Sequence, residues 1–258
     1  MRNTLSPAPL RAIMMAAGLG RRLYGDDDLH PHKALLIFGG RSLLQRHVET
    51  LHALSVVDLT LVVGYHPEDL GREVERLDAL AYVSLRYNPR FRRGSLLSLW
   101  TVRDVLRSGA DILFMDADVL YHPALIQRLV DTPHPNCFLL DRAFEGTDEP
   151  VRLCLRDGHP VEFRKGVNAG VVHDVVGEWP GFLRLSPEGA AGLADRLEAF
   201  VAAGRLEDPY EEAIRAEALA RPEAFGVEDI TGLPWIEIDF PADVDRARHE
   251  ILPRIESA

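Results

Sequence analysis

The stretch from Met14 to Leu23, MMAAGLGRRL, ends a short apolar run with small residues, two glycines and two arginines. A glycine-rich turn after a strand lets backbone N–H groups approach an anion closely, and a helix start after the turn adds positive potential. The stretch has neither the GxxxxGK[ST] pattern of a P-loop nor the GxGxxG pattern of a dinucleotide-binding turn. Two interpretations therefore stay open: a phosphate-binding loop, or a turn whose glycines need positive φ.

Lys33 lies a little further along, in PHKALL. A lysine among turn residues can be a solvated cation. After a glycine-rich turn with arginines, it instead indicates a second ligand for phosphate.

The first half of the chain alternates between strand and helix patterns. Strands are expected at 11–16, 59–63, 82–86, 112–115 and 137–140. Helices are expected at 41–54, from Pro67 onward, at 95–106 and at 123–130. Alternating βα units predict an α/β fold with a mostly parallel sheet covered by helices.

The second half has a different pattern. Residues 151–156 alternate between apolar and polar, and Asp157-Gly158 supplies a turn before 160–164, which predicts a hairpin. Further elements are expected as a strand at 182–185, helices at 189–203 and 209–220, a strand at 235–239 and a helix at 241–251.

Net charge and apolar runs exclude several classes of binding partner. The 258 residues carry a formal net charge of -11, which repels nucleic acid and anionic membranes, so any phosphate must bind in a local basic pocket. The apolar run at 13–17 is too short for a secretory signal, and none approaches the roughly 18 residues of a membrane span. The two cysteines form no CxxC pair. We expect a reduced, cytoplasmic protein.

The stretch ILFMDADVLYHP holds a second motif. Asp116 and Asp118 end an apolar strand at the edge where open α/β sheets bind ligands. Residues i and i+2 share a face, so both carboxylates can reach one cation, and hydrated Mg²⁺ suits such ligands. The alternative is a pair of capping residues. Asp118 is favoured as the direct metal ligand.

These motifs resemble the signature of nucleotidyltransferases of the sugar-phosphate type, AAGxGxR followed by a lysine, and most of all that of the phosphocholine cytidylyltransferase-like branch. The matching residues are Ala16, Ala17, Gly18, Gly20, Arg22 and Lys33. Arg21 replaces a small Ser or Thr, and Ala34 replaces a proline. The resemblance implies a Rossmann-like fold of the nucleotide-diphospho-sugar transferase type. It also implies that the loop, Leu19 included, wraps the CTP phosphates while Arg22 and Lys33 neutralise charge.

The resemblance places further site residues. In WIEIDFPADVDRA it implies Asp239 as a second metal ligand, with Glu237 as the fallback and Asp243 as a helix-start residue. In NPRFRRGSLLSLW it implies nucleotide contacts, with Asp116 joining them. The candidates are Asn88, Gly94, Ser95 and Ser98. The pyrimidine base is inferred from the branch, so UTP remains an alternative to CTP.

The acceptor side is also assigned from the resemblance. Lys165 follows the expected hairpin and is a candidate contact for a phosphate or phosphonate. Trp179, Tyr210 and Glu211 are candidates for a cage around an amine. Phe182, Asp208 and Glu212 offer the same residue types. The alternative is ordinary core packing for the aromatic rings and an exposed helix start for the acids.

The expected activity is a Mg²⁺-dependent transfer of CMP from CTP to a small phosphorylated or phosphonate head group such as phosphocholine, with release of pyrophosphate. Alternatives are a sugar-1-phosphate or inositol-1-phosphate nucleotidylyltransferase, a DxD glycosyltransferase and a nucleotide sensor. We expect one domain over 1–258, with a nucleotide-binding core at about 10–142, an acceptor-binding elaboration at about 143–232, and a closing strand and helix at 233–258. The acceptor and the oligomeric state, with a homodimer as one option, stay open.

Overall fold

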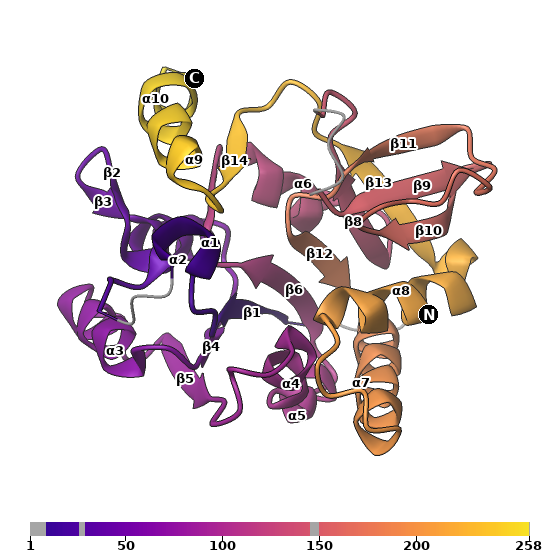
Figure 1. Ribbon diagram of the computed structural model, residues 1–258, viewed down its shortest axis with the longest axis horizontal. Coiled ribbons are helices and arrows are strands. Elements are labelled where there is room, and N and C mark those ends of the chain that lie inside the picture. The colour runs from indigo at the N-terminus through magenta and orange to yellow at the C-terminus, as the bar shows by residue number, and fades with distance from the viewer. Residues whose placement is uncertain (1–8, 26–28, 145–149, 258) are drawn as a thin grey trace, which may run out of the picture.

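A seven-stranded sheet forms the centre of the computed structural model, which describes residues 9–25, 29–144 and 150–257 (Figure 1). In spatial order its strands are β13 (Phe225–Asp229), β8 (Asn136–Leu140), β12 (Phe182–Leu185), β6 (Asp111–Asp116), β1 (Leu10–Ala16), β4 (Leu59–Val63) and β5 (Val83–Tyr87). β12 runs antiparallel to both neighbours, and the other pairings are parallel. The predicted fold class, a mostly parallel sheet covered by helices, is confirmed.

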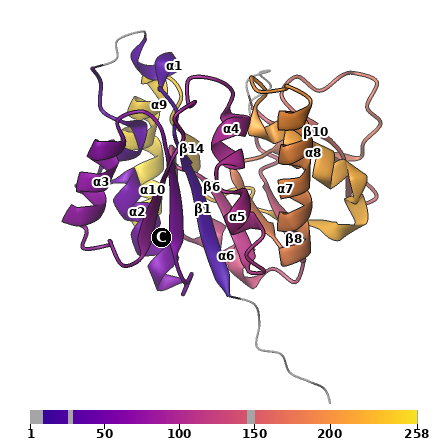
Figure 2. The ribbon, with the colours of Figure 1, turned by 90° about the horizontal axis from the view of Figure 1, so that it is seen from below.

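Helices cover both faces of this sheet (Figure 2). One face carries α2 (Leu43–Ala53), α3 (Pro67–Arg76) and α6 (Ala124–Asp131). The other carries α4 (Ser95–Trp100), α5 (Arg103–Leu106), α7 (Pro187–Ala202) and α8 (Tyr210–Ala220). Alternation along β1 serves both cores, because Ile13 packs on the second face while Ala12 and Met14 pack on the first.

Smaller elements surround the sheet. An antiparallel sheet has the order β10 (His159–Arg164), β9 (Arg152–Arg156), β11 (Val175–Glu178), and its β9–β10 hairpin is the predicted one. Two ribbons pair β2 (Ile37–Phe38) with β3 (Arg41–Ser42), and β7 (Val119–Tyr121) with β14 (Trp235–Glu237). Short helices are α1 (Arg21–Tyr24), η1 (Lys33–Leu35) and η2 (Pro222–Ala224). The chain closes with α9 (Pro241–Arg246), η3 (Ala247–Ile251) and α10 (Leu252–Glu256).

Two predicted helices differ from the observed ones. The helix expected at 95–106 breaks between α4 and α5, because Val102 leaves the helical region (φ −110°, ψ 20°). The helix expected at 241–251 becomes a π turn at η3 and then continues as α10. Pro253 lies in the first turn of α10 and has no N–H to donate, so the regular helical ladder cannot run through this point.

Two strands of the central sheet come from the segment 143–232. They are β12, which lies between β6 and β8, and β13, which forms the edge beyond β8. β11 and β13 have no predicted counterpart. Both are short and mix apolar with polar residues, so neither gives an apolar run. No helix in the described part of the chain is long and apolar enough to cross a membrane.

Candidate active site

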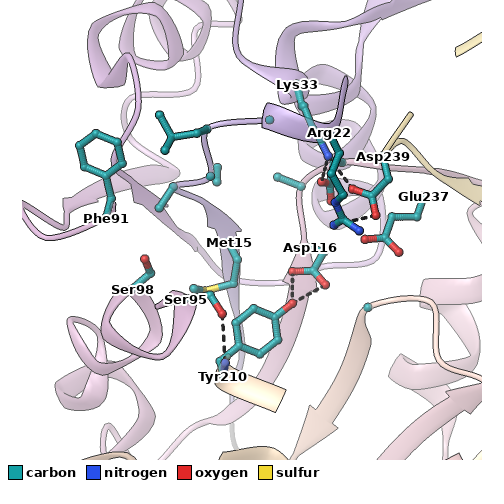
Figure 3. A pocket seen from close by; sticks show the side chains of 18 of the residues that line it. Met15, Arg22, Lys33, Phe91, Ser95, Ser98, Asp116, Tyr210, Glu237 and Asp239 are labelled. Atoms are coloured by element: carbon teal, nitrogen blue, oxygen red, sulfur yellow. Dashed lines mark hydrogen bonds and ion pairs between the residues drawn. The ribbon is translucent and has the colours of Figure 1, made fainter. Parts of the chain in front are cut away.

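Most of the motif residues line one cavity of about 430 Å³ at the carboxyl edge of the central sheet (Figure 3). Register explains why the first two motifs meet, because Met15 on β1 is level with Asp116 on β6. The loop after β1 and residues 116–118, here called the DAD motif, therefore lie side by side where β1 and β6 end. Predicted site residues in the cavity lining are Ala16, Ala17, Gly18, Leu19, Gly20, Arg22, Lys33, Ser95, Asp116, Asp118, Lys165, Trp179, Tyr210, Glu211 and Asp239.

The two glycines of the loop have different roles. Gly20 adopts the left-handed conformation (φ 67°), so here the turn interpretation of the sequence holds. Gly18 has no positive φ, and a Cβ built on it would meet no atom within 4 Å. Neither conformation nor packing therefore requires a glycine at position 18. What its missing side chain leaves open is the cavity, which suits the close approach of a ligand to the backbone.

Lys33 bridges two carboxylates. It begins η1, where the ring of His32 accepts a hydrogen bond from the Ala34 N–H and so caps the turn. The Nζ of Lys33 then lies 3.1 Å from an Asp118 carboxylate oxygen and 2.7 Å from an Asp239 oxygen. Burial opposes its charge, but the two carboxylates outweigh burial and raise the pKa of Lys33.

Three carboxylates gather around that lysine. Asp118 follows β6, Glu237 ends β14 and Asp239 lies two residues later, and one oxygen from each lies within 4.8 Å of the others. Arg22 contributes a second cation, 2.9 Å from Asp239. Burial in the cavity wall and the charges of Asp118 and Asp239 raise the pKa of Glu237 to about 8. Three hard oxygen donors at this spacing fit a divalent cation such as Mg²⁺.

Asp116 does not join this cluster. Its carboxylate oxygens lie 2.7 Å from the hydroxyl of Tyr210, the first residue of α8, and accept its hydrogen bond. Gly181 packs against it from the turn before β12, where a Cβ would come within 2.6 Å of an Asp116 oxygen. Asp118 is thus the member of the pair that faces the other carboxylates, and its role as the direct metal ligand stays a prediction. Asp116 instead joins β6 to α8.

The candidate nucleotide contacts on 88–98 divide into two kinds. Ser95 and Ser98 line the cavity. Asn88 lies outside the lining, buried, where its side-chain amide donates to Ser98 Oγ. Gly94 is also outside, because the backbone of 207–208 covers it so closely that a Cβ would meet an oxygen at 2.4 Å. Asn88 and Gly94 therefore support the wall rather than form it.

The predicted aromatic cage on the acceptor side is wrong as an open cage. Trp179 is only 4% exposed, and its Nε1 donates to the Phe182 carbonyl at 2.7 Å. Phe182 itself is fully buried. These rings pack in the hydrophobic core, and of the two only Trp179 is among the residues that line the cavity. Asp208, offered as a cage acid, lies outside the lining and pairs with Arg205.

Sequence reasoning missed several lining residues. They are Met15, His32, Phe91, Val151 and Gly181. The Pro180-Gly181 pair was a turn signal, but nothing local showed that this turn would lie against Asp116. Glu237, held only as a fallback, lies among the metal-site carboxylates.

This chain is similar in sequence and in structure to several known proteins. Over 97% of its length, this chain is 26% identical to the CMP-5'-(3-aminopropyl)phosphonate synthase of Streptomyces rubellomurinus, and it spans 40% of that protein. The inositol-1-phosphate CTP transferase from T. maritima superposes with a TM-score of 0.75 at 18% identity, covering 98% of this chain and 99% of that one. The CTP:phosphocholine cytidylyltransferase from Streptococcus pneumoniae gives 0.70 at 20% identity, covering 92% and 97%.

These two structural likenesses show a shared fold. The family model of the MobA-like NTP transferase domain matches residues 12–168, which cover the glycine loop, Lys33 and the DAD motif. That match covers more than half of the chain and confirms the nucleotidyltransferase resemblance read from the same motifs. The chain belongs to the MobA-like NTP transferase domain family.

Proposed function

We propose that this protein is a Mg²⁺-dependent cytidylyltransferase, which transfers CMP from CTP to a small phosphorylated or phosphonate acceptor and releases pyrophosphate. One observation carries the proposal: the open glycine loop, Lys33 with Arg22, and the carboxylates of Asp118, Glu237 and Asp239 converge on a single cavity. Anion-binding amides, cations and metal ligands are the parts that nucleotidyl transfer requires.

The relatives support the nucleotide and the acceptor class. A relative at 26% identity is named for a CMP-linked phosphonate product, and two proteins of the same fold are named for CTP. A DxD glycosyltransferase would need the metal carboxylates but not the grip of Gly18, Arg22 and Lys33 on a leaving pyrophosphate. A sugar-1-phosphate acceptor remains an outcome that the experiment below can return.

The reaction needs no protein nucleophile. An oxygen of the acceptor phosphate or phosphonate, already ionised at neutral pH, attacks the α-phosphorus of CTP in line. The new P–O–P bond forms as the bond to pyrophosphate breaks, and the electron pair leaves with pyrophosphate. The chain's contribution is to hold the two reactants in line and to stabilise charge on the transferring phosphoryl group.

Each charged group has a place in that scheme. The backbone around Gly18 receives the triphosphate, while Arg22 and Lys33 supply positive charge for the α-phosphoryl group and the leaving group. Asp118, Asp239 and Glu237 would hold the metal ion, which when bound neutralises phosphate charge. Lys165, which lines the same cavity, meets the anionic end of the acceptor.

A pyrophosphate-release assay tests the proposal. The purified protein is mixed with Mg²⁺, one of the four ribonucleoside triphosphates, and one acceptor. The acceptor panel comprises phosphocholine, phosphoethanolamine, 2-aminoethylphosphonate, inositol phosphate, glycerol phosphate and hexose 1-phosphates. Release with CTP and a head-group phosphate or phosphonate is expected. Release only with a hexose phosphate would indicate a sugar-1-phosphate nucleotidylyltransferase. No release with any pair would refute the transferase proposal.

A further inference from the structure

On the acceptor side of the cavity, the two aromatic rings that the described residues supply, Trp179 and Tyr210, present no open face. The ring of Tyr210 stacks edge-on against Phe114 at 5.0 Å, and the ring of Trp179 packs against Phe163 at 5.1 Å. Both residues are less than a tenth exposed. Phe91, the other aromatic residue in the lining of the described chain, lies across the cavity from Asp116 and Tyr210 (Figure 3). A quaternary ammonium needs ring faces to rest on, and these rings are occupied.

The acceptor side of the cavity instead presents carboxylate oxygens to a ligand. Glu211 follows Tyr210 at the start of α8 and lines the cavity. Its Oε2 is buried and has no hydrogen-bond partner among the described residues. A buried carboxylate oxygen left without a donor costs free energy, so it is uncommon unless a ligand supplies the donor. Burial accordingly raises the pKa of Glu211.

Asp116 adds a second carboxylate beside the first. Tyr210, which donates its hydroxyl hydrogen to Asp116, is the residue before Glu211 on α8, and both carboxylates line the cavity. Asp116 receives one hydroxyl hydrogen, from Tyr210, and a carboxylate can accept several further hydrogen bonds. Lys165 and Arg22 line the same cavity, and their charges act on Glu211. The cavity therefore places cationic side chains next to anionic ones, which matches a ligand that carries both charges.

We propose that Glu211 and Asp116 bind a primary ammonium group of the acceptor, so that the preferred substrates are aminoalkyl phosphates or phosphonates rather than choline-type ones. This inference rests on the proposed cytidylyl transfer. A primary ammonium has three N–H donors and can satisfy Glu211 Oε2, whereas a trimethylammonium has none. Lys165 then faces the anionic end of the same molecule.

Three acceptors that differ only in the head group test this with CTP held constant: 2-aminoethylphosphonate, its N,N,N-trimethyl analogue and 2-hydroxyethylphosphonate. We expect kcat/KM for the primary amine to exceed that for each of the other two by at least about 10-fold, because both lack the charged donor. Glu211→Gln should lower kcat/KM for the amine by at least about 10-fold and leave the hydroxyl acceptor within about threefold.

Glu212→Gln is the matched control. Glu212 is the next residue on α8, lies outside the cavity lining and pairs with Arg164 at 3.6 Å, so its substitution should leave all three acceptors unchanged. Equal use of the amine and trimethyl acceptors, or an equal loss for all three in Glu211→Gln, would overturn the inference while cytidylyl transfer stands. No release with any acceptor would overturn the transfer itself. If Glu211→Gln does not fold, the comparison of acceptors with the unaltered protein decides alone.

Discussion

Lys33 occupies the position where the carboxylate cluster would hold a cation, and this leads to a prediction with two opposite effects. Its ammonium bridges Asp118 and Asp239, and its side chain is only 11% exposed. A divalent ion that enters before the nucleotide must displace this ammonium. Lys33→Met removes the competitor, so we expect the variant to bind divalent ions more tightly in the absence of nucleotide.

The size of this effect follows from the two contacts, at 3.1 and 2.7 Å. Hydrogen bonds between charged groups contribute about 1.5 kcal/mol each at the lower end of their usual range. Breaking both costs about 3 kcal/mol, which corresponds to about 100-fold in the dissociation constant. The same substitution removes a cation from the transferring phosphate, so pyrophosphate release should fall by about 100-fold or more.

Titration with Mn²⁺, followed by electron paramagnetic resonance in the absence of nucleotide, measures the first effect directly. Lys165→Met is the control, because Lys165 lines the same cavity and acts by its charge on Glu237, but in the described part of the chain it has no hydrogen bond to Asp118 or Asp239. It should change Mn²⁺ affinity by less than about threefold. Mn²⁺ binding that is equal or weaker in Lys33→Met than in the unaltered protein would refute the reasoning.

Three further predictions concern single groups. Gly18→Ala should leave the melting temperature unchanged but weaken CTP binding measured by calorimetry. Gly20→Ala, at φ 67°, should instead lower the free energy of unfolding by about 1–2 kcal/mol. A loss of stability in Gly18→Ala would contradict this. Asp118→Asn should lower pyrophosphate release by about 100-fold, and retained turnover would remove Asp118 from the metal site. Burial lowers the pKa of His47 to about 4, below its ordinary 6.5, so the unfolded chain binds the proton first and stability should fall by about 3 kcal/mol as pH drops from 6.5 to 4. Urea unfolding across this range should show a shallower loss in His47→Gln, and an unchanged slope would refute the assignment.

Local patterns were enough to predict the parts of the site that follow a strand directly. The loop after β1 and the DAD motif after β6 each adjoin an apolar run, and parallel strands bring their carboxyl ends to one edge. Lys33 and Asp239 were assigned from the family resemblance, which implies a lysine after the glycine-rich loop and a metal carboxylate before the last helix.

The acceptor side could not be predicted in this way. The contact between Tyr210 and Asp116 joins residues 94 positions apart, and it depends on β12 entering the sheet beside β6. The sequence shows that Trp179 is aromatic, but not that its ring packs against Phe163 in the core. Which face of a side chain stays open is decided by tertiary packing, and no local period encodes it.

The most direct test of cytidylyl transfer is ³¹P nuclear magnetic resonance of a reaction that contains the protein, Mg²⁺, CTP and 2-aminoethylphosphonate. We predict that the acceptor phosphonate signal is replaced by the paired signals of a CMP-phosphonate anhydride, with one equivalent of pyrophosphate for each anhydride formed. Free CMP with pyrophosphate and an unchanged acceptor would show hydrolysis without transfer. CDP with inorganic phosphate would place the cleavage at the wrong bond, and either result would contradict the account.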